Sequence, residues 1–329
     1  MSIISQDTED LEIIVNNELI EPIGTITLER GMKRKASTLR ISFKKEDGKS
    51  FELGQMVTLK YKDVKAFKGY IFGIDETEGD LIKVLAYDQM RYLKNQHTML
   101  IKNKTASKLI KEIASIFRLK VGAIEDTKVD IATKQVIVEN KSLMDIIYEA
   151  LENTMLANKQ AGRLQQYILY DDYGELKLAK LNDLKTDLLI DGESILKYSY
   201  SQNIDGETYN KILIYYKDDK DHKINNFITE NSTLEDKWGV LQKTVSTQRI
   251  TESQASKYGA DLLKYYSVPK KSFRISTVVT DINIRGGTKI AVTLDNKAQN
   301  YFIVDTVTHK FTNNEYTMDM VLLLSLIHI

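Results

Sequence analysis

The residue types that most often carry chemistry are scarce and scattered in this chain. Its 329 residues include four histidines and no cysteine. His97, His222, His309 and His328 lie far apart, and no two have the spacing of a helical zinc-binding pair. A zinc site needs three or four ligands, so folding alone would have to assemble one. The sequence predicts no metal site, and His97 and His309 are interpreted as surface or hydrogen-bonded core residues near strand ends.

Glycine-rich loops and nucleophile motifs are also missing. No G-x-S-x-G elbow, G-x-x-x-x-G-K-[ST] loop or G-x-G-x-x-G turn occurs. The glycine pair in Arg285–Thr288 lies among β-prone residues, without the helix that would hold a phosphate at its N-terminus. It is interpreted as a tight turn. We therefore expect no bound cofactor.

Paired carboxylates are the remaining candidates, because a glycosidase needs two acids that flank the scissile bond. The densest acidic stretch is Asp75–Asp80, at an apparent hairpin turn around Gly79. Asp171-Asp172 and Asp218-Asp219 are turn-like too. A catalytic acid also needs a pocket that raises its pKa, and no apolar surroundings are evident. The sequence predicts solvated loops, no catalytic residue and no enzymatic activity.

The overall charge argues against nucleic-acid binding. Lysine plus arginine and aspartate plus glutamate both number 46, so the formal net charge is zero. A protein that binds duplex DNA usually has a basic excess, because neutralising phosphates supplies most of its affinity. No apolar run approaches the roughly 18–20 residues of a membrane-spanning helix, and Met1–Asp10 show no signal-peptide pattern. We expect no stable nucleic-acid binding and no membrane insertion.

The first hundred residues have the pattern of β-strands. Apolar and polar residues alternate with period two, which places each apolar set on one face of a sheet. Turn signals separate the runs at Glu46–Lys49 and Glu78–Asp80. The alternating apolar sets are Leu39, Ile41 and Phe43; Val57, Leu59 and Tyr61; and Tyr70, Phe72 and Ile74. Several short strands with regular turns favour a barrel or sandwich over residues 1–98.

Residues 99–196 change to a mixed pattern. Apolar residues recur at helical spacing after Thr105 and again after Ser142, which has Asp145 three residues later, as in a capping box. A hairpin is predicted around Asp171–Gly174. This segment is interpreted as a small α/β domain inserted between β domains.

Strand patterns return over residues 197–323, with one helix predicted at 251–266. Thr251 and Gln254 have capping-box spacing, and Pro269 stops the helix. The order of features near the end repeats that of the first domain. Gly54 and Gly287 each open a strand that is followed by a loop, a second strand, a turn and a third strand. Such a repeat predicts two related β-barrels in one chain, although any two β-meanders can look alike.

The stretch from Phe67 to Asp75 is followed by Tyr87-Asp88 with Arg91-Tyr92-Leu93. These segments resemble the XkdQ/YqbQ family of defective-prophage tail proteins, and the second is the most specific. Further matching segments extend the resemblance over about residues 10 to 322. They are Lys104–Ile110, Trp238–Gln242, Gln254-Ala255, and Tyr301–Asp305 with His309.

The resemblance implies a structural baseplate hub subunit of a contractile phage or phage-like tail. It implies two related antiparallel β-barrel tube domains plus the small α/β domain, and a homotrimer that joins the sixfold tail tube to a threefold spike. Expected partners are copies of the chain, the tail tube protein, the central spike protein and other baseplate proteins. We expect assembly in the host cytoplasm and a final place in the tail baseplate of the particle.

Two other readings stay open: a tail-associated peptidoglycan hydrolase, and a carbohydrate- or protein-binding tail module. If DNA passes through the lumen of a ring, basic walls would retain it, so a neutral or acidic lumen is expected, with Asp75–Asp80 as a contributor. Residues 324–329 resemble a translated sequencing adapter and are interpreted as a non-native tail. A genuine terminal strand is the alternative for this β-prone run.

Overall fold

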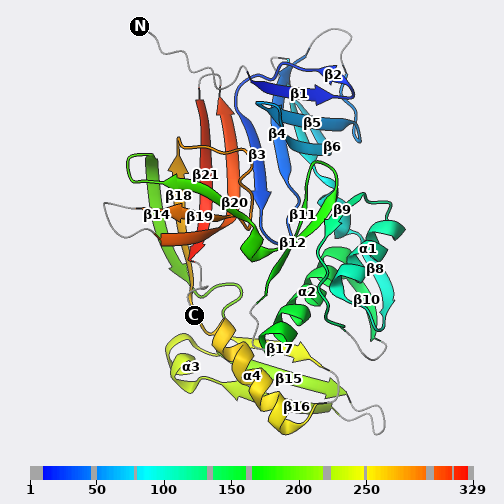
Figure 1. Cartoon of the computed structure of the whole chain (residues 1–329), viewed down its shortest axis with the longest axis vertical. Helices are drawn as coiled ribbons and strands as arrows, with labels where there is room; N and C mark the ends of the chain where they lie inside the picture. The colour runs from blue at the N-terminus through cyan, green and yellow to red at the C-terminus, as the bar shows by residue number, and fades with distance from the viewer. Residues whose placement is uncertain are drawn as a thin grey trace. The chain divides into compact units, whose positions relative to one another are not determined.

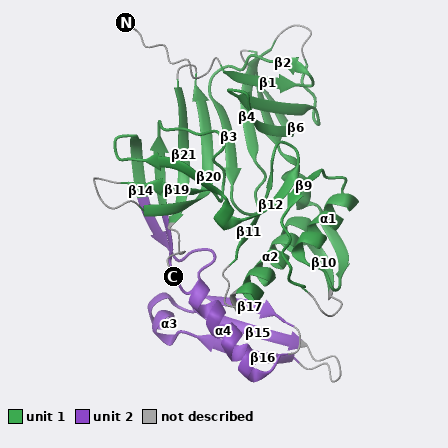
Figure 2. Cartoon of the chain, in the orientation of Figure 1, with its two compact units in different colours: residues 1–199, 273–329 green, residues 200–272 purple. Residues whose placement is uncertain are grey.

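The computed structural model describes residues 10–45, 50–77, 80–131, 136–160, 165–217, 224–247, 250–293, 300–312 and 315–324. The chain divides into two compact units, shown in different colours in Figure 2. The larger contains Met1–Ser199 and Phe273–Ile329, and the smaller contains Tyr200–Ser272. In the described parts of the chain, no helix is long and apolar enough to cross a membrane.

The N-terminal half of the larger unit is an antiparallel sheet (Figure 1). Its strands are β1 (Leu11–Val15), β2 (Glu18–Leu19), β3 (Ile26–Gly31), β4 (Thr38–Lys44), β5 (Met56–Tyr61), β6 (Val64–Thr77) and β7 (Leu81–Tyr87). They are hydrogen-bonded in the order β3-β4-β7-β6-β5-β1-β2. The predicted alternation is confirmed on β4, where Leu39, Ile41 and Phe43 are buried and Arg40 is exposed.

The C-terminal half of this unit adds a second set of strands to the same sheet. They are β13 (Lys185–Ile190), β14 (Ile195–Asn203), β18 (Lys270–Thr277), β19 (Lys289–Val292), β20 (Asn300–Thr312) and β21 (Glu315–Leu324). Residues 200–203 of β14 and 270–272 of β18 belong to the smaller unit. Their pairing order is β13-β19-β20-β21-β18-β14. The N-terminal half has the order β1-β5-β6-β7-β4-β3. Taken in chain order, β1, β3, β4, β5, β6 and β7 correspond to β13, β14, β18, β19, β20 and β21, and with this correspondence the two pairing orders are the same. The halves differ in one direction, because β1 is antiparallel to β5 whereas β13 is parallel to β19.

Local hydrogen bonds repeat as well. The amide of Gly54 donates to the carbonyl of Ile71 at 2.8 Å, and the amide of Gly287 donates to the carbonyl of Val304 at 2.7 Å. Directly after Ile71 the register between β6 and β7 shifts, and directly after Val304 the register between β20 and β21 shifts. The repeat predicted from Gly54 and Gly287 is therefore present in both strand order and bulge position.

The halves are joined edge to edge by β3 and β20. β19 pairs with the first part of β20, and β3 pairs with the remainder, from Thr306 opposite Gly31 to Phe311 opposite Ile26. The result is a continuous 13-stranded sheet among the described strands. No pairing in the described part of the chain closes either half into a barrel.

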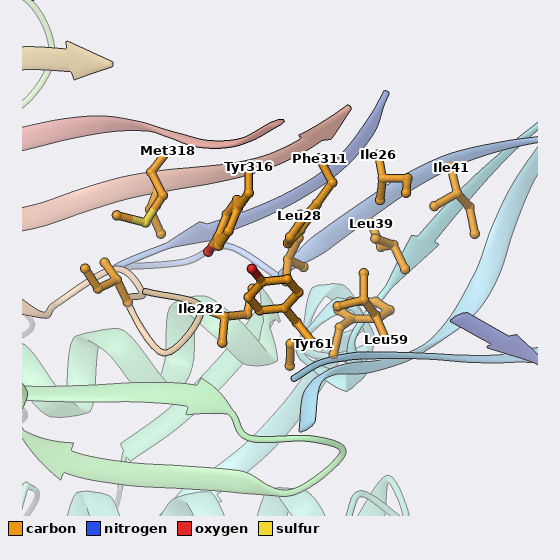
Figure 3. Packing of buried hydrophobic residues seen from close by; sticks show 14 of the residues in the cluster. Ile26, Leu28, Leu39, Ile41, Leu59, Tyr61, Ile282, Phe311, Tyr316 and Met318 are labelled. Carbon is orange, nitrogen blue, oxygen red and sulfur yellow. The ribbon is translucent and has the colours of Figure 1, made fainter. Parts of the chain in front are cut away.

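One hydrophobic core lies beneath both halves of the sheet, as Figure 3 shows. At its centre Phe311 and Tyr316 stack with ring centroids 4.3 Å apart, and Tyr61 meets the edge of Tyr316 at 5.1 Å. Leu28 and Leu39 lie beside them and are fully buried. Residues of both halves therefore exclude water from the same interior.

Residues 88–184 form an α/β part with its own core, which overlaps the segment 99–196 for which an α/β domain was predicted. It contains η2 (Gln89–Lys94), β8 (Gln96–Ile101), α1 (Ala106–Ile116), β9 (Val121–Ile124), β10 (Val136–Ser142), α2 (Leu143–Gln160), β11 (Tyr167–Asp171), β12 (Leu176–Lys180) and η3 (Leu181–Asp183). Both predicted helix starts are confirmed. Thr105 caps α1 by accepting from the Lys108 amide, and the Ser142 hydroxyl accepts from the Asp145 amide at 3.0 Å. The predicted hairpin is present, with the Gly174 amide donating to Asp171.

The smaller unit is a three-stranded sheet with helices. It contains β15 (Lys211–Lys217), β16 (Ile224–Glu230), α3 (Ser232–Trp238), β17 (Gln242–Ser246) and α4 (Glu252–Tyr266), with strand order β16-β15-β17. The predicted capping box of Thr251 and Gln254 is confirmed at the start of α4. The unit lies within residues 197–323, for which the sequence predicted a second barrel with one helix. The division at 98, 196 and 323 stays a prediction.

Several predicted features lie outside the described residues. They are the turn at Glu46–Lys49, the Glu78-Gly79 part of the acidic stretch, Asp218-Asp219, His222 and His328. Leu324 is the last residue of β21 and lies opposite Phe302. Residues 325–329 also lie outside the described residues, so the expectation of a non-native tail stays a prediction.

Truncating Phe311 should destabilise the larger unit. Its ring is fully buried between strands of both halves, so Phe311→Ala should lower the free energy of unfolding by roughly 3–5 kcal/mol. Urea unfolding followed by far-ultraviolet circular dichroism measures the loss. Leu53→Ala is the control, because Leu53 is 67% exposed. Equal stability of Phe311→Ala and Leu53→Ala would contradict the packing described.

Candidate functional site

Among the described residues no group of histidine and acidic side chains could hold a metal ion. His309 is fully buried in β20, and its ring nitrogens lie 2.9 Å from the Ile284 carbonyl and 2.8 Å from the Tyr316 hydroxyl. A carbonyl can only accept, so Nε2 carries the proton and the Tyr316 hydroxyl donates to Nδ1. Burial, with the nearby Arg30 charge, lowers the pKa of His309 to about 3. Of the two alternatives for His309, a surface residue or a hydrogen-bonded core residue, the second is confirmed.

Arg30 ties the two halves together from within. It is 5% exposed and lies on β3. Its guanidinium donates to the Ile282 carbonyl at 2.7 Å and to the Ala66 carbonyl on β6. Burial, and then the Arg285 charge, lowers the pKa of Arg30 to about 9, so the group stays charged at neutral pH. Arg30 and His309 together fix the segment 282–284 against the sheet.

The turn at Arg285–Thr288 completes this junction. The Thr288 amide donates to the Arg285 carbonyl at 3.0 Å, so the predicted tight turn is confirmed. A Cβ atom on Gly286 would collide with the backbone of Gly31 and Met32 at the end of β3. Glycine at 286 therefore permits a close backbone approach between the two halves.

Two buried carboxylates lie where the α/β part meets the sheet. Asp88 accepts from the amides of Ser37 at 2.8 Å and Met90 at 3.0 Å, and so caps η2. Burial raises the pKa of Asp88 to about 6. Burial, and then the Asp88 charge, raises the pKa of Asp171 to about 7. Arg285 donates to the Asp171 carbonyl at 2.9 Å. Sequence reasoning placed Asp88 in the family signature without predicting that it is buried.

These carboxylates accept hydrogen bonds from backbone amides, and neither of them lines the two cavities described next. One cavity, of about 230 Å³, is lined by Lys68, Tyr70, Gln89, Tyr92, Phe117, Arg118, Leu119, Lys120 and Gly174. A second, of about 310 Å³, contains a single acidic residue, Asp319, which forms an ion pair with Lys310. A glycosidase needs two carboxylates facing the substrate. Neither of these cavities offers that arrangement.

The acidic stretch divides between strand and turn. Asp75 and Glu76 are exposed on β6, and Glu76 forms an ion pair with Lys45 at 2.8 Å. Asp80 is an exposed residue with a positive φ of 60° at the start of β7. The described part of the stretch is thus a solvated hairpin end, as the sequence indicated.

Arg30 generates a stability prediction. Arg30→Met keeps an apolar stem but leaves the Ile282 and Ala66 carbonyls without their donor, so unfolding should become easier by roughly 2–3 kcal/mol. Arg40→Met is the matched control, because Arg40 lies on the adjacent strand and is exposed. Urea melts by circular dichroism measure both. Trp238, the only tryptophan, lies in the smaller unit, so its fluorescence transition should stay unchanged in Arg30→Met.

The raised carboxylate pKa values predict a pH dependence. A carboxyl whose pKa is raised by folding adds stability that is fully present below about pH 4 and lost as pH rises through about 6 to 7. Asp171→Asn removes one group and its repulsion of Asp88. The fall in melting temperature between pH 5 and pH 8 should therefore be smaller than in the natural chain. Asp80→Asn alters an exposed carboxylate and should keep the natural pH profile. An identical profile for Asp171→Asn would refute the assignment.

Comparisons with known proteins agree on a tail-protein fold. A family model described as YQBQ-like matches residues 26–323, and no curated protein matches the chain. A tail protein from Neisseria meningitidis has a TM-score of 0.70 at 10% identity, over 96% of each chain. A prophage MuSo2 tail protein from Shewanella oneidensis has a TM-score of 0.66 at 11% identity, over 95% of this chain and 97% of that protein. The prophage tail protein gp18 from Listeria monocytogenes has a TM-score of 0.57 at 12% identity, over 95% of this chain and 94% of that protein.

Proposed function

The chain belongs to the YQBQ-like family, and from this premise we propose that it is a non-enzymatic structural subunit of the baseplate hub in a contractile phage or phage-like tail. The shared fold of the prophage tail proteins supports a structural role in a tail. The further steps, to a hub and to a trimer, rest on the internal repeat.

The single observation that carries the hub assignment is the identical strand order of the two halves. A chain with two equivalent halves presents two similar faces at similar angles. Three such chains around one axis would present six related halves to a sixfold tail tube and three identical chains to a threefold spike. Closed point-group symmetry is the usual state of homo-oligomers and constrains these interfaces directly. In the proposal each half acts as a tube-type barrel whose remaining edges are covered by neighbouring subunits.

The proposed partners follow from this arrangement: two further copies of the chain, the tail tube protein, the central spike protein and other baseplate proteins. The chain assembles in the host cytoplasm and ends in the tail baseplate. The lumen of the ring is neutral or acidic, in line with a formal net charge of zero and with the exposed Asp75 and Glu76. Such a wall would not retain DNA through phosphate contacts.

Removing the gene from the producing host should abolish complete tails. Electron microscopy of the induced lysate should show no baseplate-bearing particles, because the tube would lack its platform, and expression of the natural chain in trans should restore them. An epitope tag on the restored chain should be labelled at the baseplate end only. The purified chain at high concentration should have three times the mass of one subunit. Complete tails without the gene would overturn the proposal.

A further inference from the structure

One end of the large sheet is an uncovered strand. In the described part of the chain β14 pairs with β18 on one side and with no strand on the other. Leu196, Tyr198 and Tyr200 alternate along it and are 59%, 60% and 59% exposed. The Tyr198 ring lies 5.8 Å from that of Phe273, which belongs to the main core. These large side chains thus extend the core-facing side of the sheet beyond the point where anything covers it.

A second uncovered edge lies on β6. β5 pairs with β6 only from Val64 to Tyr70, and the Ile71 amide then donates to the Gln55 carbonyl. From Gly73 to Thr77 the described pairing of β6 is with β7 alone. Unpaired amides and carbonyls along a strand edge are a ready template for another strand.

The counterparts of these two uncovered edges pair with each other within the chain. β3 is the counterpart of β14, and β20 is the counterpart of β6, with Ile71 matching Val304. β3 pairs antiparallel with β20 immediately beyond Val304, from Thr306 to Phe311. By the same correspondence, the segment that would receive β14 is the uncovered part of β6. The inward side chains of β3 show the effect of pairing, since Ile26 and Leu28 are 5% and 0% exposed.

We propose that β14 of one copy of this chain pairs antiparallel with residues 73–77 of β6 in a neighbouring copy, repeating the β3–β20 joint between subunits. The inference rests on the self-association in the proposed function and assigns it to particular strands. Within one chain β18, β21, β20, β3, β4 and β7 separate β14 from β6 in the sheet, and no described pairing joins β14 to β6. The partner is therefore a second copy.

The charges on the outer face suit this contact. Lys197 on β14 lines an outer-face cavity together with Thr306 and Thr308 of β20. Asp75 on β6 is the counterpart of Thr308, because each lies four residues after the matched Ile71 or Val304. Paired strands would therefore carry the exposed Lys197 and the exposed Asp75 on the same outer face. Opposite charges favour this pairing over like-with-like pairing of the same edges.

The contact joins two different surfaces, so it is heterologous and can close into a ring. The absence of cysteine in the sequence allows a clean test by mixing. Asp75→Cys and Lys197→Cys are made as separate full-length proteins, both at exposed positions. Each is treated with a short bismaleimide cross-linker, alone and after mixing with the other. We expect cross-linked dimer chiefly in the mixture, at least tenfold above either protein alone.

The outcomes separate this inference from the proposed function. A trimer mass without the mixed cross-link would overturn the strand assignment and leave the hub proposal standing. Equal cross-linking of either variant alone would show a symmetric contact and would also overturn the assignment. A monomer at every concentration, without mixed product, would overturn both.

A second measurement tests the side chains. Tyr198→Glu places a charge on the face that should be buried, so it should raise the dissociation constant measured by sedimentation at least tenfold. Ile137→Glu on β10 is the matched control, since Ile137 is likewise 60% exposed but lies on a different sheet; it should associate as the natural chain does. Equal association of both variants would refute the burial of Tyr198. Unchanged circular dichroism confirms that both variants are folded.

Discussion

The antiparallel joint between β3 and β20 is the contact on which the larger unit depends. It turns two related halves into one sheet with one core. Separately, each half would expose a strand edge and the apolar face behind it, which is a hazard for aggregation. The joint covers the edge of β3, and Arg30 secures it by reaching from β3 to Ile282 and Ala66. Because a buried guanidinium loses its hydration, these carbonyl partners are what make its burial tolerable.

Much of this architecture could be predicted from residue periodicity and capping. Period-two alternation located β4, and helical spacing with a capping residue located α1, α2 and α4. The strand order could not be predicted, because alternation identifies which residues face a core but not which strands pair. The sheet of the smaller unit, with β15 parallel to β17, was missed for this reason. The glycines at 54 and 287 gave the useful long-range signal, since each marks the same turn in a repeat.

The buried polar groups show why a search for chemistry by residue type fails here. Arg30, Asp88, Asp171 and His309 all have pKa values displaced by burial, and such displacement is often a sign of an active site. Here each of these side chains forms hydrogen bonds with backbone groups. Asp88 caps η2, Asp171 holds the hairpin at Gly174, and His309 and Arg30 fix the segment 282–284. Sequence alone could not predict this, because arginine and aspartate are usually exposed.

A duplicated chain has a consequence that a single β domain lacks. When two related halves join through non-equivalent edges, β3 on β20, the counterpart edges on β14 and on residues 73–77 of β6 are left without a described strand partner. In the proposed assembly these edges repeat the β3–β20 joint, so the interaction that builds the monomer would also join one monomer to the next. In that assembly the rotation that relates the halves, applied once more, generates one half of the next subunit. Closure of that rotation gives a ring and failure to close gives a filament, so in the proposed assembly the angle at the β3–β20 joint would decide between the two.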